Sequence, residues 1–280
     1  MKRVVTIQDI SCVGKCSLTV ALPIISAMGI ETAVVPTAVL STHTAFQNFT
    51  FCDLTDQIQP IADHWVAEKI DFDGIYTGYL GSFRQLQLVS DFFDRFRTTG
   101  NLILVDPAMG DYGKLYTGFT PEFALEMGKL CGKADIIVPN MTEAAFMLGI
   151  PYVDQGYDEA YVQDVLRKLC GLGTRIAVLT GVNYVPGKLG VMSYDSEKDQ
   201  FESYFNEKID VNYHGTGDIF ASAFFGALMN GVTLAKSMEI AAEYTVAAIR
   251  STEEDPNGHW YGVNFEAVVP QLLQMLGEAR

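Results

Sequence analysis

Short apolar runs alternate with longer stretches of mixed polarity along most of the chain. The apolar runs are rich in β-branched residues and have strand length; they are residues 4–7, 32–39, 74–77, 102–105, 136–138 and 176–179. Strands that are buried on both faces read as continuous apolar runs of this kind. The stretches between them have helical length, for example residues 18–28, 55–69, 84–97 and 159–170. This alternation predicts an α/β fold with a mostly parallel sheet covered by helices on both sides.

The pattern changes toward the end of the chain. Residues 189–194 and 200–205 predict a hairpin around the polar turn 195–199, and three helices are predicted after it, at 218–229, 234–250 and 265–276. No linker rich in proline or serine, internal repeat or low-complexity tract interrupts the chain. A chain of 280 residues can form one large α/β domain, so we expect a single domain over residues 1–280.

Polar and glycine-rich segments follow most of the predicted strands. These segments are residues 9–11, 78–82, 106–111, 139–143 and 180–181. Ligands of open α/β sheets bind at the carboxyl ends of the strands, where such segments gather. We therefore expect the functional residues to lie mainly in these segments.

The strongest local signal is the run from His214 to Ala223, His-Gly-Thr-Gly-Asp-Ile-Phe-Ala-Ser-Ala. Glycines 215 and 217 flank Thr216, and an apolar helix is predicted to begin there. The first turn of a helix has unpaired N–H groups and the positive end of the helix dipole, which suit an anion. Asp218 would lie beside that anion and could take a proton from an incoming hydroxyl. The alternative is that Thr216 or Asp218 only caps the helix.

A second group contains the carboxylates Asp106, Asp111 and Glu143 together with Asn140. Magnesium, which accompanies nucleotide phosphates, prefers oxygen ligands and keeps several waters. Asn140 and Glu143 are about one helical turn apart, so both side chains could face the same metal-bound waters. The alternatives are a helix cap for Glu143 and a plain turn for Asp106.

Two further segments could contact an organic ligand. His43 lies in the polar segment Ser41–Thr44, ahead of the Phe-rich stretch 46–51 that could form a flap. Tyr79 follows a glycine at a predicted strand end and could stack on a flat ring. A lone histidine is more often a satisfied structural residue, and Tyr79 could equally be part of the core.

Composition and missing motifs exclude several classes. The net charge of −15 disfavours nucleic acid as a partner. Five cysteines without a C-x-x-C pair indicate reduced thiols. The longest apolar run, 18–30, is interrupted by a proline and is too short to cross a bilayer, and no signal peptide is recognised. We therefore expect a cytoplasmic protein that binds no membrane. The P-loop, G-x-G-x-x-G and H-E-x-x-H motifs are absent. Their absence disfavours a P-loop NTPase, a standard dinucleotide dehydrogenase and a zincin metalloprotease, respectively.

These motifs, in this order, resemble those of the ribokinase-like superfamily and in particular of pyridoxal kinases. The resemblance runs from about Ile7 to Ala223. It rests on the motifs Gly215-Thr216-Gly217-Asp218, Asn140-Met141-Thr142-Glu143, Asp106-Pro107-Ala108-Met109-Gly110-Asp111, Ser41-Thr42-His43-Thr44, Gly78-Tyr79 and Lys208-Ile209-Asp210-Val211. Each motif is only moderately specific, but the ordered set is strong.

The resemblance implies a three-layer α/β/α fold with a central, mostly parallel sheet, and it implies roles for the residues. It makes Asp218 the catalytic base and the amides of Gly215, Thr216 and Gly217 the holders of the transferred charge. ATP would contact Asp106, Asp111, Glu143, Thr180, Gly181, Val211 and His214, with Mg²⁺ positioned by Asp106, Asn140 and Glu143. The substrate would contact Ser11, Asp9, His43, Thr44 and Tyr79. A monovalent cation such as K⁺ and a homodimer are further family features.

One position departs from the family pattern. In many pyridoxal kinases a serine directly follows the glutamine of the first strand and binds the pyridine ring. Here Gln8 is followed by Asp9, and Ser11 comes two residues later. The ring contact is carried over to Ser11, with Asp9 as its competitor, and this bears on the identity of the substrate.

The predicted function is ATP-dependent phosphorylation of the 5′-hydroxymethyl group of pyridoxal, pyridoxine or pyridoxamine, which gives pyridoxal 5′-phosphate or related phosphates. One alternative is a hydroxymethylpyrimidine kinase of thiamine biosynthesis, because that substrate is also flat and has a hydroxymethyl group. The other is a non-catalytic vitamer-binding protein on the same fold. A pure binding protein has no need of a base beside an anion site, so Asp218 favours an enzyme.

Overall fold

The alternation of strands and helices predicted above is present in the computed structural model, which describes residues 1–211 and 213–280. The chain divides into two compact units. The first unit consists of Met1–Gly78 and Ile209–Arg280, and the second is Tyr79–Lys208. Within the described residues, no helix combines the length and the apolar character needed to cross a membrane.

The sheet of the first unit is built around its first strand. Strand β1 (Arg3–Val13) pairs in parallel with both β2 (Glu31–Thr42) and β4 (Gly74–Thr77), and the short β3 (Phe51–Asp53) pairs antiparallel with β2. The apolar residues Val4, Val5 and Ile7 are completely buried, as their continuous run predicted. β1 extends well past the predicted residue 7, so that residues 9–11 belong to a strand and not to a loop.

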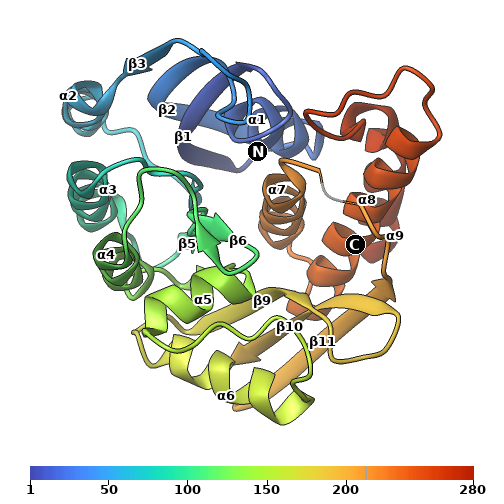
Figure 1. The fold of residues 1–280 in the computed structure, drawn as a ribbon. Coiled ribbons are helices and arrows are strands. Elements are labelled where there is room, and N and C mark those ends of the chain that lie inside the picture. Colours follow the sequence, from blue (N-terminus) through green and yellow to red (C-terminus); the bar gives the residue numbers. More distant parts are fainter. Residues whose placement is uncertain (212) are drawn as a thin grey trace. The chain divides into compact units, whose positions relative to one another are not determined.

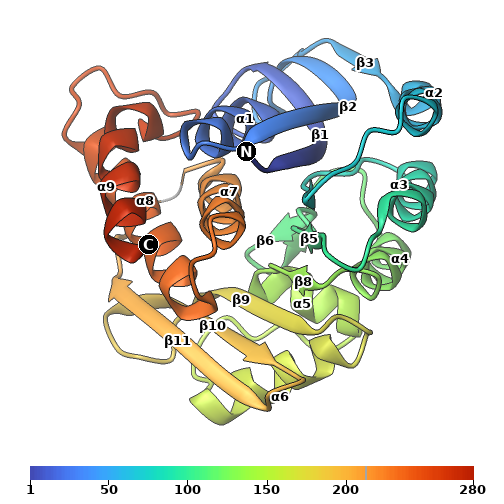
Figure 2. The same cartoon turned by 180° about the vertical axis from the view of Figure 1, so that it is seen from behind.

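Helices cover both sides of this sheet (Figure 1). Helix α2 (Thr55–Ala67) lies on one side, and α1 (Leu18–Ala27) and α7 (Thr216–Met229) lie on the other. α8 (Leu234–Glu253) packs on α7, and a 3-10 turn (Phe265–Val268) leads into α9 (Val269–Ala279), as Figure 2 shows from behind. Gly74 allows α7 to approach β4 closely, because a Cβ there would come within 2.7 Å of the Phe225 ring.

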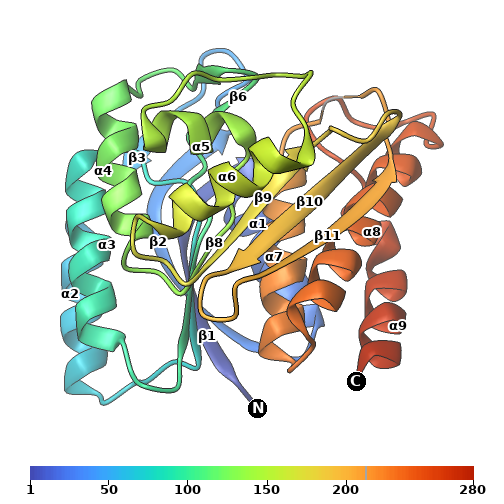
Figure 3. The same ribbon diagram turned by 90° about the horizontal axis from the view of Figure 1, so that it is seen from below.

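The second unit combines parallel and antiparallel strands. β5 (Leu102–Val105), β8 (Ile136–Ile137) and β9 (Ile176–Val182) are parallel, whereas β10 (Lys188–Asp195) and β11 (Gln200–Glu207) form the predicted antiparallel hairpin next to β9. Its helices are α3 (Phe83–Phe96), α4 (Pro121–Cys131), α5 (Met141–Leu148) and α6 (Glu159–Cys170). Figure 3 shows α6 lying over β9 and β10. A small hairpin, β6 (Gly110–Asp111) with β7 (Lys114–Leu115), follows β5.

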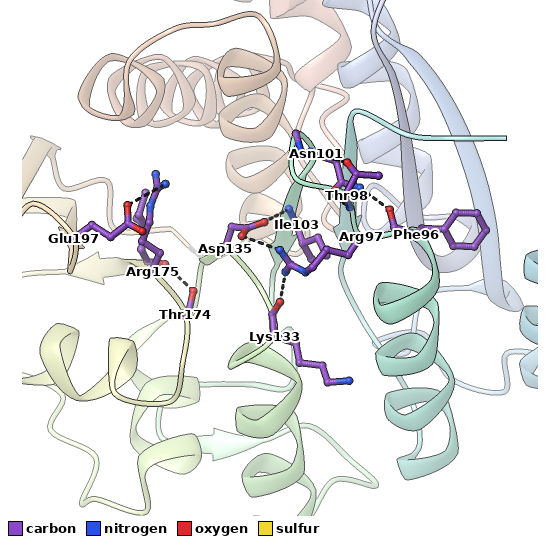
Figure 4. Close-up of polar contacts among 12 residues, drawn as sticks. Phe96, Arg97, Thr98, Asn101, Ile103, Lys133, Asp135, Thr174, Arg175 and Glu197 are labelled. Carbon is purple, nitrogen blue, oxygen red and sulfur yellow. Dashed lines mark hydrogen bonds and ion pairs between the residues drawn. The ribbon is translucent and has the colours of Figure 1, made fainter. Parts of the chain in front are cut away.

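Polar contacts fasten the amino ends of the strands of the second unit (Figure 4). Asp135, just before β8, accepts hydrogen bonds from the Arg97 guanidinium at 3.0 Å and from the Ile103 backbone N–H at 2.7 Å. One carboxylate thus links the end of α3 to the beginnings of β5 and β8. The opposite, carboxyl ends of these strands lead into the segments 106–111 and 139–143 that the sequence marked as candidates.

Candidate active site

In the first unit, Asp9 lies at a β-bulge of strand β1. The register of β1 on β2 shifts between Gln8 and Ile10, so Asp9 has no regular partner. Such bulges re-aim a side chain and are common beside active sites. Asp9 is only 4% exposed and Ser11 only 1% exposed, and the Ser11 hydroxyl donates to an Asp9 carboxylate oxygen at 3.1 Å. Ser11 and Asp9, the two candidates for the predicted ring contact, are therefore hydrogen bonded to each other.

Ser17 is the residue before α1. It has a φ of 50°, and its side chain makes no helix-capping hydrogen bond. Burial raises the pKa of Asp9, and the hydroxyls of Ser17 and Ser11 act on it in the opposite direction. Ser17 was not among the residues predicted from the sequence, because its backbone conformation leaves no local motif.

The Gly215–Gly217 loop packs directly on the segment before Ser17. Gly215 has a φ of +83°, and a Cβ there would lie 1.8 Å from the Lys15 carbonyl oxygen, so no other residue fits. Around Gly217, by contrast, no atom lies within 4 Å of the position that a Cβ would take. The loop is therefore closely supported at Gly215 and open at Gly217.

Asp218 lies in the first turn of α7. The N-cap of this helix is Gly215, so the alternative in which Thr216 or Asp218 caps it does not hold. Burial raises the pKa of Asp218 to about 7, and the negative charge of Asp9 raises it further, while the Ser17 N–H acts in the opposite direction. A carboxyl with a pKa near neutrality is well suited to general base catalysis.

His43 has hydrogen-bond partners for both ring nitrogens. Nδ1 accepts from the Ala45 N–H at 3.2 Å, so Nε2 must carry the hydrogen that it shares with the Tyr261 carbonyl at 3.1 Å. Burial lowers the pKa of His43, which agrees with a neutral ring. His43 thus joins the flap to the loop before the 3-10 turn. Thr44 beside it is exposed, and contacts of either residue with a substrate remain predictions.

An aromatic cluster extends from this histidine. The ring of Phe46 lies 4.6 Å from that of Trp260, and the His43 ring lies 5.0 Å from that of His214. An open pocket of about 520 Å³ adjoins the cluster and is lined by Val211, Tyr213, Thr252, Glu253, Asp255, Gly258, His259 and Trp260. Val211 and His214 were predicted from the sequence, whereas Trp260 was not, although the aromatic run His259-Trp260-Tyr261 is visible there.

In the second unit, Asn140 and Glu143 form a capping box. Asn140 accepts from the Glu143 N–H at 3.0 Å, and Glu143 Oε2 accepts from the Asn140 N–H at 2.8 Å. Glu143 Oε1 accepts from the Met109 N–H at 3.0 Å, and the Asn140 amide donates to the Gly110 carbonyl at 2.8 Å. The capping alternative for Glu143 is therefore present, and the same contacts fasten the segment 106–111.

The fit of this segment to a magnesium ion is partial. Asp106 and Glu143 are buried. Burial of the Cys131 thiol, together with the charges of Glu143 and Asp106, raises the pKa of that thiol. Burial raises the pKa of Glu143, while the N–H groups of Asn140 and Met109 lower it. Among residues 1–211 and 213–280, no cluster of three or more His, Cys, Asp or Glu could enclose a metal. The oxygen donors therefore suit an ion that keeps most of its waters.

The remaining predicted residues of the second unit lie at strand ends. Thr180 forms an isolated parallel β-bridge with Asn140, and the Thr180 hydroxyl donates to the Pro139 carbonyl at 3.4 Å. Gly181 is exposed with a φ of +73°. Asp111 is exposed on the β6–β7 hairpin, and the ring of Tyr79 lies 5.4 Å from that of Phe119. The structure therefore brings Asn140, Glu143 and Thr180 together.

Comparisons with known proteins agree with this fold. The family model described as phosphomethylpyrimidine kinase matches residues 22–263. A provisionally named phosphomethylpyrimidine kinase of Bacteroides thetaiotaomicron, whose crystal contains pyridoxal, is 39% identical, with a TM-score of 0.91 over 97% of this chain and 95% of that one. Pyridoxal kinase from Lactobacillus plantarum is 29% identical, with a TM-score of 0.89 over 99% of both chains. The pyridoxine/pyridoxal/pyridoxamine kinase of Bordetella avium is 26% identical and aligns over 89% of this chain and 85% of its own length.

The fold is thus the ribokinase-like α/β fold, as the sequence predicted. The chain belongs to the phosphomethylpyrimidine kinase family, and its matched relatives include pyridoxal kinases. The resemblance inferred from the ordered motifs is confirmed, and the chain is an enzyme of the kinase class.

Proposed function

We propose that this kinase uses ATP to phosphorylate the 5′-hydroxymethyl group of a B6 vitamer: pyridoxal, pyridoxine or pyridoxamine. The proposal depends most on the position of Asp218, which lies in the first turn of α7 beside the Gly215–Gly217 loop. Burial raises the pKa of its carboxyl to about 7. At neutral pH a large fraction of this carboxyl is ionised and able to accept a proton. The crystal of the Bacteroides relative with pyridoxal supports the choice of vitamer.

In this mechanism Asp218 accepts the proton of the substrate's hydroxymethyl group as the hydroxymethyl oxygen attacks the γ-phosphorus of ATP. The bond from that phosphorus to the β–γ bridging oxygen breaks, and ADP leaves. The backbone N–H groups of Gly215, Thr216 and Gly217 stabilise the charge on the transferred group, because the first turn of a helix presents unpaired donors. Magnesium, when bound, neutralises charge on the nucleotide phosphates. Asp106, Asn140 and Glu143 would hold it through water, since their fixed positions suit a hydrated ion.

For the nucleotide we propose contacts with Asp106, Asp111, Glu143, Thr180, Gly181, Val211 and His214, the residues that the resemblance implies. Val211 lines the pocket of about 520 Å³ beside Trp260, which is wide enough for part of a nucleotide. A monovalent cation such as K⁺, a homodimer, one functional domain over residues 1–280 and a cytoplasmic location complete the proposal.

Hydroxymethylpyrimidine is the second candidate substrate. Both the matched family model and the provisional name of the Bacteroides relative give phosphomethylpyrimidine kinase. The compound is flat, carries the same hydroxymethyl group, and would present an amino group to the acidic first strand. The reaction at Asp218 would be the same for either compound.

The test is a comparison of kcat/KM for the three vitamers and hydroxymethylpyrimidine at fixed ATP and Mg²⁺. We expect the highest value for a B6 vitamer. Turnover of hydroxymethylpyrimidine at least about tenfold better than every vitamer would reassign the substrate and leave the kinase chemistry intact. Binding of a vitamer without turnover of any compound would favour the non-catalytic alternative.

A further inference from the structure

We propose that His43 is a positioning residue: its neutral ring fastens the flap, residues 43–50, to the loop 259–262, and protonation of the ring releases the flap. The proposal rests on the proposed function for its meaning in catalysis, but every contact that carries it lies within the first unit. It gives His43 a different role from the substrate contact that the family resemblance implies, because both ring nitrogens already have partners.

The flap is closed at its base by two hydrogen bonds. The Ser41 N–H donates to the Thr50 carbonyl at 3.1 Å, and the Thr50 N–H donates to the Ser41 hydroxyl at 2.9 Å. Within the flap, the Phe46 N–H donates to the His43 carbonyl at 3.1 Å. These bonds shape the flap, but they do not join it to the loop 259–262.

The His43 ring makes that connection. It is 5% exposed, and its Nδ1 accepts a hydrogen bond from the Ala45 N–H of the flap at 3.2 Å. Its Nε2 lies 3.1 Å from the Tyr261 carbonyl, which can only accept, so Nε2 donates. The ring also packs on the backbone just after β1, because a Cβ at Gly14 would lie 2.7 Å from its Cδ2 atom. One buried imidazole therefore touches three separate segments of the unit.

Aromatic rings extend the same connection. The Phe46 ring lies edge-on to the His43 ring at 5.0 Å, and it lies 4.6 and 5.6 Å from the rings of Trp260 and Tyr261. The His43 and Trp260 rings are 6.0 Å apart, also edge-on. Ring pairs at such distances stabilise a structure beyond the area that they bury. Phe46 of the flap is thus packed on the loop that receives the histidine hydrogen bond.

The connection requires a neutral imidazole. Nδ1 can accept from the Ala45 N–H only while it has a free lone pair, and a proton there would set two donors against each other. Burial lowers the pKa of His43 and so favours the neutral ring. Both hydrogen bonds are therefore present above the ordinary histidine pKa of about 6.5, and one of them is lost as the pH falls through the lowered pKa.

The neighbouring charges act in the same direction. The titratable groups on the segments packed against His43 are His214, His259, Lys15 and the phenol of Tyr261. The His214 ring lies 5.0 Å from that of His43, and a positive charge on His214 lowers the pKa of His43 further. The Lys15 ammonium is paired with the Glu266 carboxylate at 2.9 Å.

A fastened flap would prepare the site for its substrate. Thr44, the predicted substrate contact next to His43, is exposed on the flap. A segment that is already held in place does not have to be ordered when the ligand binds, so less affinity is lost. Release of the flap should therefore raise KM more than it lowers kcat.

The first test is a pH titration of Trp260 fluorescence without any substrate. The chain has two tryptophans, so Trp65→Phe leaves Trp260 as the only one. An imidazolium quenches a neighbouring excited indole by accepting an electron, so the emission should fall with a midpoint below about pH 6.5. His43→Gln cannot titrate and should abolish this transition. His259→Gln is the matched control and should retain it, because the His259 ring stacks on Tyr261.

The second test measures release of the flap by chymotrypsin. The protease needs a locally opened segment, so the rate of cleavage after Phe46 or Phe49 reports the open population. His43→Ala loses both ring hydrogen bonds, and cleavage at about pH 7.5 should become about three- to tenfold faster. His43→Gln keeps a donor for the Tyr261 carbonyl and should recover part of the protection. His64→Ala, at an exposed position of α2, is the control and should cleave like the wild type.

Kinetics with pyridoxine then separate the two roles of His43. In His43→Ala, KM should rise about three- to tenfold with a smaller change in kcat, and His43→Gln should restore part of the loss. A raised KM with unchanged flap cleavage would overturn the proposal and restore His43 as a direct substrate contact.

The remaining outcomes do not depend on turnover. If His43→Ala does not fold, the fluorescence titration still decides, because a transition that is absent below about pH 6.5, or that survives in His43→Gln, would overturn the proposal. A titration and cleavage pattern as expected in an enzyme that phosphorylates no vitamer would support the fastened flap and overturn the proposed function instead.

Discussion

The carboxylates of the two units are held in different ways. Glu143, in the second unit, receives one backbone N–H on each oxygen and closes a capping box, which fixes a loop. Burial raises the pKa of both carboxyls, to about 8 for Glu143 and to about 7 for Asp218 in the first unit. The pKa therefore does not distinguish them, but the backbone donors do. N–H groups on both oxygens fix Glu143 in a cap, so we expect it to shape its loop, whereas Asp218 is the predicted base.

The largest expected effect is that of Asp218→Asn. The amide occupies the same volume but cannot accept the proton, so kcat should fall by about two to four orders of magnitude. Thermal unfolding should show that the fold is retained, and nucleotide binding should persist. A variant with more than about a third of the wild-type kcat would remove Asp218 from the role of base.

Gly215→Ala tests how tightly the glycine loop is supported. The new Cβ would collide with the Lys15 carbonyl at a φ that L residues rarely adopt, so the free energy of unfolding should fall by about 2 to 4 kcal/mol. Gly217→Ala is the control in the same loop, because a Cβ there meets no atom within 4 Å. Its unfolding free energy should change by less than about 1 kcal/mol. Equal losses in chemical denaturation would contradict the assigned packing.

Glu143→Gln tests the second unit. Two backbone N–H groups donate to Glu143. In the glutamine variant one of them would face the amide NH₂ group, which cannot accept its hydrogen bond. The unfolding free energy should therefore fall by about 1 to 3 kcal/mol. If the carboxylate also orients metal-bound water, the Mg²⁺ concentration needed for activity should rise as well. The exposed Glu126→Gln on α4 is the control for both readouts. Loss of stability with an unchanged Mg²⁺ titration would leave helix capping as the only role of Glu143.

The smallest effect concerns the thiols. Burial and two nearby carboxylates raise the pKa of Cys16 to about 12, so alkylation by iodoacetamide at neutral pH should be slow. The exposed Cys12 and Cys52 should be modified first. Peptide mass spectrometry over time measures the order. Modification of Cys16 as fast as that of Cys12 would contradict the raised pKa of the Cys16 thiol.

Much of the fold was predictable because burial on both faces leaves a continuous apolar signal, as at 102–105 and 176–179. The place of Asp218 in the first turn of α7 was predictable, because glycines before an apolar helix form a local pattern. The bulge at Asp9 was not, since it depends on the register between β1 and β2. The turn at Ser17 was not predictable either, because it depends on a positive φ and on the packing of Gly215, about 200 positions away in the chain, against Lys15.

The most direct measurement is the pH–rate profile of kcat/KM with pyridoxine at saturating Mg²⁺ and ATP. A base whose folded pKa is raised to about 7 is protonated below that value, so activity should fall as the pH drops through neutrality. The residual activity of Asp218→Asn should lack this acid limb. A wild-type profile that stays flat down to about pH 5 would contradict the account, because the reaction would then not require a carboxylate of raised pKa.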